Sequence, residues 1–168
     1  MKNVLLLSVG LFISNLLGAQ KISSENLPLD VASSFKNKYS TAEKASWEMD
    51  YDNYQVNFTF LKTDMTALFN PNGEWLETDA HIKETELPKE VKDSLTKHFG
   101  AVLTTYNIEE AQKIESPKRD MFYYLVVVQN LTTYDMVLKE NGHIVLKEKR
   151  TDDSEGVLKF KKTKKKEK

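Results

Sequence analysis

The sequence predicts an α+β fold built as a tandem repeat, in which one helix followed by a four-stranded antiparallel sheet occurs twice. Two short motifs recur in the same order. The segment Leu-Pro-Leu-Asp-Val at 27–31 returns as Leu-Pro-Lys-Glu-Val at 87–91, and the Asn-Gly pair at 72–73 returns at 141–142. The interval between the two motifs is longer by nine in the second copy, which therefore carries an insertion. Motifs repeated at a nearly fixed period are typical of repeated supersecondary units.

Residues 1–19 have the pattern of a secretory signal peptide. Lys2 supplies a short positive region, the segment from Val4 to Leu17 is mostly apolar, and Gly18-Ala19 ends it with small residues. We therefore expect cleavage after Ala19 and a mature protein that is periplasmic or secreted. The apolar run is shorter than the roughly 20 residues that cross a bilayer, so we expect no membrane span after cleavage.

The mature chain divides into four further segments. We expect residues 20–26 to be a lead-in, 27–82 to be the first repeat, 87–149 to be the second repeat, and 150–168 to be an acidic loop followed by a disordered lysine-rich tail. The sequence contains no cysteine, so disulfides cannot stabilise the fold. Apolar burial must hold the repeats together.

The charge is distributed unevenly along the chain. From Val157 onward there are seven lysines and one glutamate, whereas residues 20–156 contain 16 basic and 24 acidic residues, a net charge of −8. An acidic body argues against nucleic-acid binding, which needs a basic face. The lysine-rich tail either contacts anionic surfaces or only keeps the protein soluble.

Each helix is predicted by a proline and an apolar stripe. Pro28 and Pro88 suit the first turn of a helix, where the missing N–H costs nothing. Apolar residues then recur at every fourth position, as on one face of a helix. The two stripes are Leu27, Val31, Phe35 and Tyr39 in the first unit, and Leu87, Val91, Leu95 and Phe99 in the second.

After each helix the apolar residues alternate with polar ones, which predicts strands. Asn-Gly tolerates the positive φ of tight hairpin turns, so each pair is expected to join the last two strands of its unit. The expected strands are 45–51, 54–60, 65–69 and 75–82 in the first unit, and 103–113, 121–129, 134–139 and 143–149 in the second.

A helix covers only one face of a sheet, which leaves the other face for a neighbour or a partner. Tyr124, Val126 and Val128 point away from the helix in a strand that is apolar on both faces. They would pack on the other unit or bind a protein partner. Trp47 and Trp75 either belong to the core or lie on the open face, where tryptophan often anchors a partner. These five residues are the candidate partner-binding residues.

The sequence shows no catalytic, cofactor or metal motif. His81, His98 and His143 are far apart in the sequence, and there is neither a cysteine nucleophile nor a Gly-x-Ser-x-Gly elbow. The acidic residues lack the spacing of a cation-binding loop. We therefore expect a protein that is not an enzyme and that uses no cofactor and no metal.

The order of these motifs resembles the PepSY-like family, more narrowly the β-lactamase-inhibitor-like PepSY-like domains of secreted Bacteroidetes proteins. The resemblance covers about residues 26–148. It rests on the two Leu-Pro helix openings, the strand with Trp47, Tyr-x-Val-x-Phe at 54–58 and Phe-x-x-x-Gly-x-Trp at 69–75. It implies a secreted module with a tandem helix-plus-sheet fold. The related inhibitors grip an enzyme with a concave sheet surface, but they contain disulfides and this chain has none.

Two functions remain open from the sequence. The first is a non-enzymatic module that binds a protein on its open sheet face, with a secreted hydrolase as the partner class that the resemblance implies. The alternative is a small-ligand or envelope-sensing domain with a pocket between sheet and helix. An exposed apolar patch on the open face would favour the first function, and an internal cavity with polar groups would favour the second.

Overall fold

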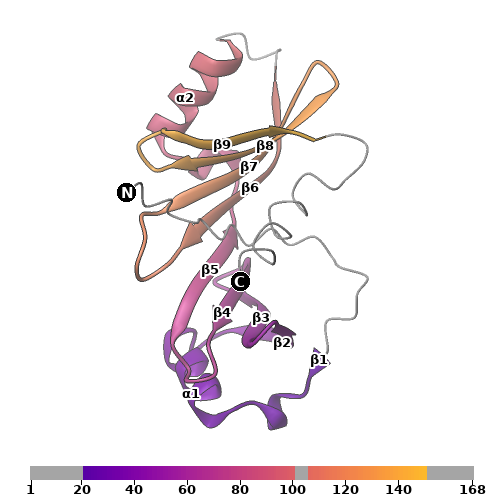
Figure 1. The fold of residues 1–168 in the computed structure, drawn as a ribbon, viewed down its shortest axis with the longest axis vertical. Helices are drawn as coiled ribbons and strands as arrows, with labels where there is room; N and C mark the ends of the chain where they lie inside the picture. The colour runs from indigo at the N-terminus through magenta and orange to yellow at the C-terminus, as the bar shows by residue number, and fades with distance from the viewer. Residues whose placement is uncertain (1–20, 101–105, 151–168) are drawn as a thin grey trace, which may run out of the picture.

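The computed structural model describes residues 21–100 and 106–150, which form one antiparallel sheet of nine strands with two helices (Figure 1). The expected signal peptide and lysine-rich tail lie outside the described residues. Neighbouring strands in the sheet are also consecutive in the chain. The strands are β1 (Lys21–Ile22), β2 (Glu43–Asp50), β3 (Asn53–Phe60), β4 (Thr63–Phe69), β5 (Trp75–His81), β6 (Asn107–Glu115), β7 (Phe122–Gln129), β8 (Thr132–Lys139) and β9 (Ile144–Lys149).

The two α-helices are short and each follows a single 3-10 turn. α1 (Leu29–Lys38) comes after η1 (Ser24–Asn26), and α2 (Lys89–Phe99) comes after η2 (Glu84–Glu86). The prolines at 28 and 88 occupy the position directly before each helix, one residue earlier than the first helical turn. In the described part of the chain, neither helix has the length and apolar character that a membrane crossing requires.

The predicted fold class is wrong in its central feature, because the two halves share one sheet. β5 pairs with β6 through four residue pairs, from Thr78–Glu115 to His81–Gln112. β1, which lies in the predicted lead-in, adds a ninth strand by pairing with β2. The structure is mostly β and is not a tandem repeat of separate four-stranded sheets. Pairing β5 with β6 satisfies backbone N–H and C=O groups that two separate sheets would leave unpaired at their edges.

Both helices lie on the same face of this sheet. Residues directly opposite each other on paired antiparallel strands point to the same face. Ala80 pairs with Lys113, and Lys113 pairs with Tyr123, which packs in the core under α2. Thr78, two residues before Ala80 on β5, is hydrogen-bonded to Tyr39 at the end of α1. We call this face the helix-bearing face and the opposite one the helix-free face.

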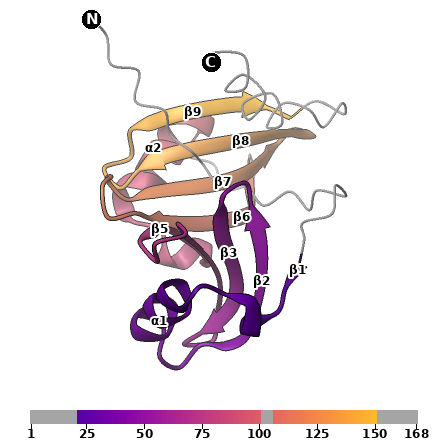
Figure 2. The same ribbon diagram turned by 60° about the horizontal axis from the view of Figure 1, so that its bottom comes forward.

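The sheet twists strongly along its length. β2 and β3 run across the direction of β6 to β9 (Figure 2). The lower half in Figure 1 carries α1 and the upper half carries α2. Each helix therefore has its own apolar core on the shared face.

The core under α1 is rich in aromatic side chains. Phe35 from α1 contacts the edges of Trp47 and Phe58, with ring centroids 5.2 and 5.0 Å apart. The buried members are Val31, Tyr39, Trp47, Val56, Phe58, Ala67 and Phe69. The buried members of the α2 core are Leu87, Val91, Leu95, Phe99, Ala111, Tyr123, Leu125, Val127, Met136 and Leu138. These side chains fill the space between each helix and the sheet.

The glycine of each Asn-Gly turn fixes a hairpin against a helix. Gly73 has a φ of +76° and Gly142 a φ of +78°. A Cβ at Gly73 would lie 2.5 Å from the carbonyl oxygen of Asp30, and one at Gly142 would lie 2.3 Å from that of Glu90. Only glycine combines the positive φ with such a close approach of two backbones.

Candidate binding face

The helix-free face changes character along the sheet. On β2 to β4 it carries mostly polar side chains that are exposed or half-buried: Ser46, Glu48, Gln55, Asn57, Asp64 and Thr66. On β6 to β8 it carries a buried apolar cluster: Ile114, Phe122, Tyr124, Val126 and Val137. The second group is buried although both helices lie on the other face.

An open hollow of about 280 Å³ lies on the polar part of the helix-free face. Its floor is organised by two cross-strand hydrogen bonds. Thr66 Oγ1 donates to Asn57 Oδ1 at 2.7 Å, and Thr59 Oγ1 donates to Asp64 Oδ1 at 2.9 Å. The lining residues are Lys44, Ser46, Asn57, Phe58, Thr59, Asp64, Met65, Thr66 and His81. Such a lining offers hydrogen bonds to a partner or ligand.

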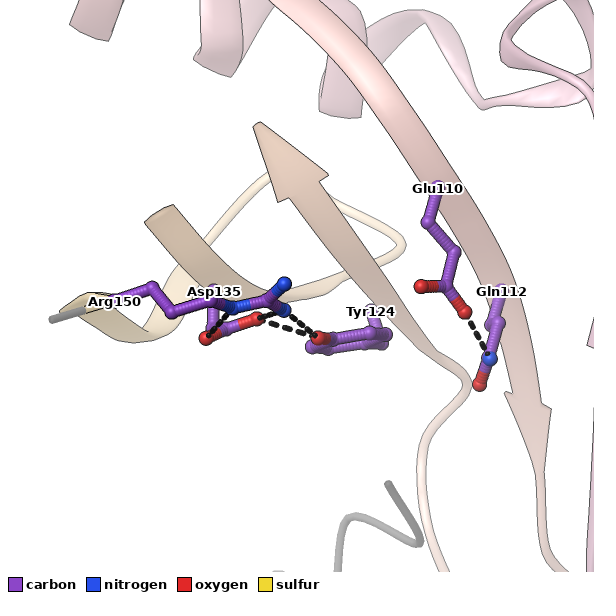
Figure 3. A network of polar contacts seen from close by, with 5 residues as sticks. All are labelled: Glu110, Gln112, Tyr124, Asp135 and Arg150. Atoms are coloured by element: carbon purple, nitrogen blue, oxygen red, sulfur yellow. Dashed lines mark hydrogen bonds and ion pairs between the residues drawn. The ribbon is translucent and has the colours of Figure 1, made fainter. Parts of the chain in front are cut away.

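Figure 3 shows a polar network on β7, β8 and the end of β9. Arg150 donates through Nε to Asp135 Oδ2 at 3.1 Å and through Nη2 to Asp135 Oδ1 at 2.5 Å. The Tyr124 hydroxyl donates to the same Asp135 Oδ1 at 2.5 Å, and Arg150 Nη2 lies 3.3 Å from that hydroxyl. On β6, Gln112 donates to Glu110 at 2.6 Å. Asp135 is only 2% exposed, so the bidentate arginine compensates a buried charge.

The environment of Tyr124 keeps its hydroxyl protonated. Burial raises the pKa of Tyr124 first, and its hydrogen bond to Asp135 raises it further. The hydrogen bond to Asp135 likewise raises the pKa of Arg150. Tyr124 therefore acts as a hydrogen-bond donor to Asp135 at every ordinary pH.

A second group of buried charges lies on β5. Arg119 Nη2, from the loop between β6 and β7, lies 2.6 Å from Glu77 Oε2. Asp79 is 6% exposed, and its Oδ1 has no hydrogen-bond partner among the described residues. Burial, with a smaller contribution from the charge of Glu77, raises the pKa of Asp79 to about 8, and Arg119 opposes this shift.

The two tryptophans lie on the helix-bearing face. Trp47 is 5% exposed and belongs to the core under α1. Trp75 is half-buried against the same core, where its Nε1 donates to Thr78 Oγ1 at 2.8 Å and Lys38 Nζ lies 3.4 Å from its ring centroid. The sequence left open whether the tryptophans belong to the core or to the open face. The structure places Trp47 in the core and Trp75 against it.

The three candidates on β7 point to the helix-free face. Tyr124 and Val126 are each 2% exposed, and Val128 is half-buried. Their orientation away from α2 agrees with the register of β7, but Tyr124 and Val126 present almost no surface. A contact between these residues and a partner remains a prediction.

The histidines lie in three different places. His81 borders the open hollow, His143 follows the β8–β9 turn, and His98 is at the end of α2. Lys147 Nζ lies 2.6 Å from His98 Nε2. Burial lowers the pKa of His98, and the positive charge of Lys147 lowers it further. Within residues 21–100 and 106–150, no three His, Asp or Glu side chains are grouped to hold a metal ion.

Sequence reasoning missed the buried carboxylates Glu77, Asp79 and Asp135. Each is a charged residue inside a strand whose neighbours in the sheet are largely buried. A usable signal was present, because Asp135 interrupts an apolar strand and Glu77 and Asp79 share one face at an i, i+2 spacing. Acidic residues are rarely buried without a partner, so such positions call for a basic neighbour or a function.

Several solved structures share this fold. A protein described as a "putative periplasmic" protein of Bacteroides eggerthii is 18% identical, with a TM-score of 0.67 over 79% of this chain and 94% of that one. A DUF2874 family protein of Bacteroides uniformis is 21% identical, with a TM-score of 0.66 over 76% and 93%. A BLIP-like protein of Bacteroides fragilis is 18% identical, with a TM-score of 0.63 over 73% and 86%. At these identities the similarity establishes the fold alone.

The sequence itself identifies the family. No curated protein matches the chain. The family described as "Putative beta-lactamase-inhibitor-like, PepSY-like" matches residues 52–145, which is more than half of the 168 residues. This range runs from the β2–β3 turn to β9 and so includes most of the helix-free face. The chain therefore belongs to the beta-lactamase-inhibitor-like, PepSY-like family.

Proposed function

We propose that this protein is a secreted or periplasmic binding module that holds a protein partner on its helix-free face and catalyses no reaction. The observation that carries the proposal is the placement of both helices on one face of a continuous sheet. The opposite face offers half-exposed polar side chains on β2 to β4 and an open hollow. Extended, rigid sheet surfaces suit protein recognition because they need little ordering on binding.

The family and the charge of the chain narrow the class of partner. The name of the family refers to inhibitors of β-lactamase, so a secreted hydrolase is the first class to test. The net charge of −8 over residues 20–156 favours a partner surface that is neutral or basic. A periplasmic location agrees with the sequence of residues 1–19 and with the description of the similar protein from Bacteroides eggerthii.

The packing gives less support to a ligand pocket between sheet and helix. Aromatic side chains fill the space under α1, and aliphatic and aromatic side chains fill the space under α2. The hollow of about 280 Å³ is open to solvent and is lined by β-strand residues. Enclosed, largely apolar cavities are the usual sites for small ligands.

The proposal is tested with a matched pair of serine substitutions. Ser46 is exposed on β2 and lines the hollow, whereas Ser33 is exposed on α1. The chain from Gln20 to Lys168 captures binding proteins from a periplasmic extract, mass spectrometry identifies them, and the affinity of each purified partner is then measured. We expect Ser46→Arg to weaken binding at least tenfold, because a long cation fills the hollow and repels a basic surface.

The control variant Ser33→Arg should change the affinity less than twofold. Thermal unfolding of both variants confirms that they remain folded. If a partner binds the two variants equally well, the helix-free face is not the binding face. A variant Ser33→Arg that alone loses binding would move the binding site to the helix-bearing side.

A further inference from the structure

Two acidic side chains of the helix-free face lack an ion-pair partner. Glu110 on β6 and Glu148 on β9 lie on this face, and neither forms an ion pair with the described residues. The face therefore holds negative charge that the described part of the chain does not neutralise.

Asp79 gives an independent reason to expect a cationic ligand here. It lies on the helix-free face in β5, between Thr66 of β4 and Ile114 of β6. Its side chain is buried in the sheet face, with 6% exposed, and its Oδ1 accepts no hydrogen bond from the described residues. Buried carboxyl oxygens are nearly always bonded, so an orphaned one indicates a missing donor.

The end of β9 directs the chain onto the same face. The Arg150 backbone N–H donates to the Thr133 carbonyl at 2.8 Å, which continues the β8–β9 ladder. The Arg150 side chain is held by Asp135 and Tyr124 on the helix-free face (Figure 3). The residues that follow Arg150 therefore start from a fixed point beside this face.

We propose that the lysine-rich segment 157–168 binds the helix-free face of its own chain, between β5 and β9. This segment carries seven lysines and one glutamate and begins shortly after Arg150. Lysine ammonium groups supply the hydrogen-bond donor that Asp79 Oδ1 lacks and the positive charge that Glu110 and Glu148 lack. The segment would cover the part of the helix-free face from β5 to β9, beside the hollow on β2 to β4 that the proposed function assigns to a partner, and its binding requires no partner.

The length of the connection is sufficient. Glu110 on β6 lies three strand spacings from Arg150 and nearly level with it, about 16 Å away. Asp79 on β5 is four strand spacings away and about six residues further along the strands, a distance of about 28 Å. The chain from Arg150 to Lys159 has an average end-to-end distance of about 17 Å, so the first lysines reach Glu110. The chain to Lys168 extends to about 60 Å at most and averages about 23 Å, so the last lysines reach Asp79.

The covalent connection between Arg150 and the lysine-rich segment also compensates for the weakness of each lysine–carboxylate contact. An exposed lysine–carboxylate pair contributes little by itself and is screened by salt. A short flexible connection raises the effective concentration of the lysines to the millimolar range. Several weak pairs then suffice at low salt, and the contact should be lost at high salt.

Zero-length carbodiimide cross-linking tests the proposal, because it joins a lysine to a carboxylate only when the two are in contact. The chain from Gln20 to Lys168 is cross-linked at 20 mM and at 500 mM NaCl, and the linked peptides are identified by mass spectrometry. We expect lysines 159–168 to link to Glu110 and Glu148 at least fivefold more often than to the control carboxylates Glu90 and Asp93 on α2. The yield should fall at least threefold in the higher salt.

Mixing isotope-labelled with unlabelled protein separates links within one chain from links between chains. Links within one chain support the proposal. Mixed-isotope links would overturn it, because a second copy would then be the occupant. Equal linking to Glu90 and Asp93, or no links from lysines 159–168 to the helix-free face, would also overturn it.

Discussion

Arg150 and Asp135 form a bidentate ion pair that joins the end of β9 to a buried position in β8. The guanidinium group remains partly exposed, whereas the Asp135 side chain is almost fully buried and also accepts the hydroxyl of Tyr124. Burying a carboxylate is costly unless hydrogen-bond donors satisfy it. Arg150 and Tyr124 supply these donors, which allows the charged Asp135 to lie beside the apolar cluster of the helix-free face.

Replacing Arg150 by methionine should therefore destabilise the fold. The substitution keeps much of the side-chain volume but leaves Asp135 buried with the Tyr124 hydroxyl as its remaining described donor. We expect a loss of about 2 kcal/mol in the free energy of unfolding measured in urea, less than a fully buried pair would cost, because Arg150 is partly exposed. Lys149→Met, at the neighbouring exposed position, should cost less than about 0.5 kcal/mol. Equal effects of the two substitutions would show that the ion pair does not contribute to stability.

Asp79 should make the protein less stable as the pH rises. Its folded-state pKa of about 8 lies above the ordinary value of 3.8, so the unfolded chain releases this proton at a lower pH than the folded chain does. The contribution of protonated Asp79 to the free energy of unfolding is fully present below about pH 4. It is lost progressively as the pH rises to about 8. We expect Asp79→Asn to be more stable than the wild type at pH 8, by an amount on the order of 3 kcal/mol, and similar to it at pH 4.

Unfolding curves between pH 4 and pH 9 in 500 mM NaCl, where the contact of the lysine-rich segment is lost, measure this difference. Asp64→Asn, at an exposed position of the same face, is the control and should not reproduce the pH-dependent gain. A difference between Asp79→Asn and the wild type that stays constant with pH would contradict the assignment. Glu77 and Arg119, the charged neighbours of Asp79, are unchanged in both variants.

The β8–β9 turn should not tolerate a side chain at Gly142. A Cβ there would lie 2.3 Å from the Glu90 carbonyl oxygen, and the φ of +78° is itself unfavourable for alanine. We expect Gly142→Ala to lower the free energy of unfolding by about 2 kcal/mol or more, since strain and a backbone clash add. Asn72→Ala, at the exposed tip of the β4–β5 turn, is the control and should have a small effect. A tolerated Gly142→Ala would mean that α2 does not approach the turn so closely.

Phe35 should carry a large share of the stability of the first half. Its ring contacts Trp47, Phe58 and Phe69 with centroids 5.0 to 6.2 Å away. We expect Phe35→Ala to cost about 3 kcal/mol in thermal or urea unfolding, because the removed ring leaves a cavity among rigid aromatic side chains. Leu29→Ala on the same helix should cost almost nothing, since Leu29 is 84% exposed. Similar losses in the two variants would place Phe35 outside the core.

The local features of the fold were predictable because they depend on short-range patterns. The four-residue apolar spacing located both helices within about two residues, and the alternation around Val56 separated the core positions of β3 from the polar positions of its other face. The Asn-Gly pairs located two hairpin turns, since a positive φ is needed there. Each of these signals involves residues that are close together in the chain.

The pairing of β5 with β6 was not predictable by the same means. The alternation of side chains along β5 shows which face of the sheet each residue points to. It does not show which strand pairs with the free edge of β5. The contact of Arg119 with Glu77 joins residues 42 positions apart in the sequence and depends on that pairing. The sequence left open whether Tyr124 and Val126 are buried or free for a partner, because burial on the helix-free face depends on the whole molecule.

The choice of the helix-free face as the binding face is tested most directly by photo-cross-linking. A photo-reactive benzophenone side chain is introduced at Thr66, on β4 in the hollow of the helix-free face, and in a matched variant at Thr96, exposed on α2. Each folded variant is irradiated with the partner identified by capture, and the cross-linked product is quantified by mass spectrometry. We expect the partner to cross-link at Thr66 and not at Thr96. Cross-linking at Thr96 alone, or at neither position while binding persists, would contradict the claim that the helix-free face is the binding face.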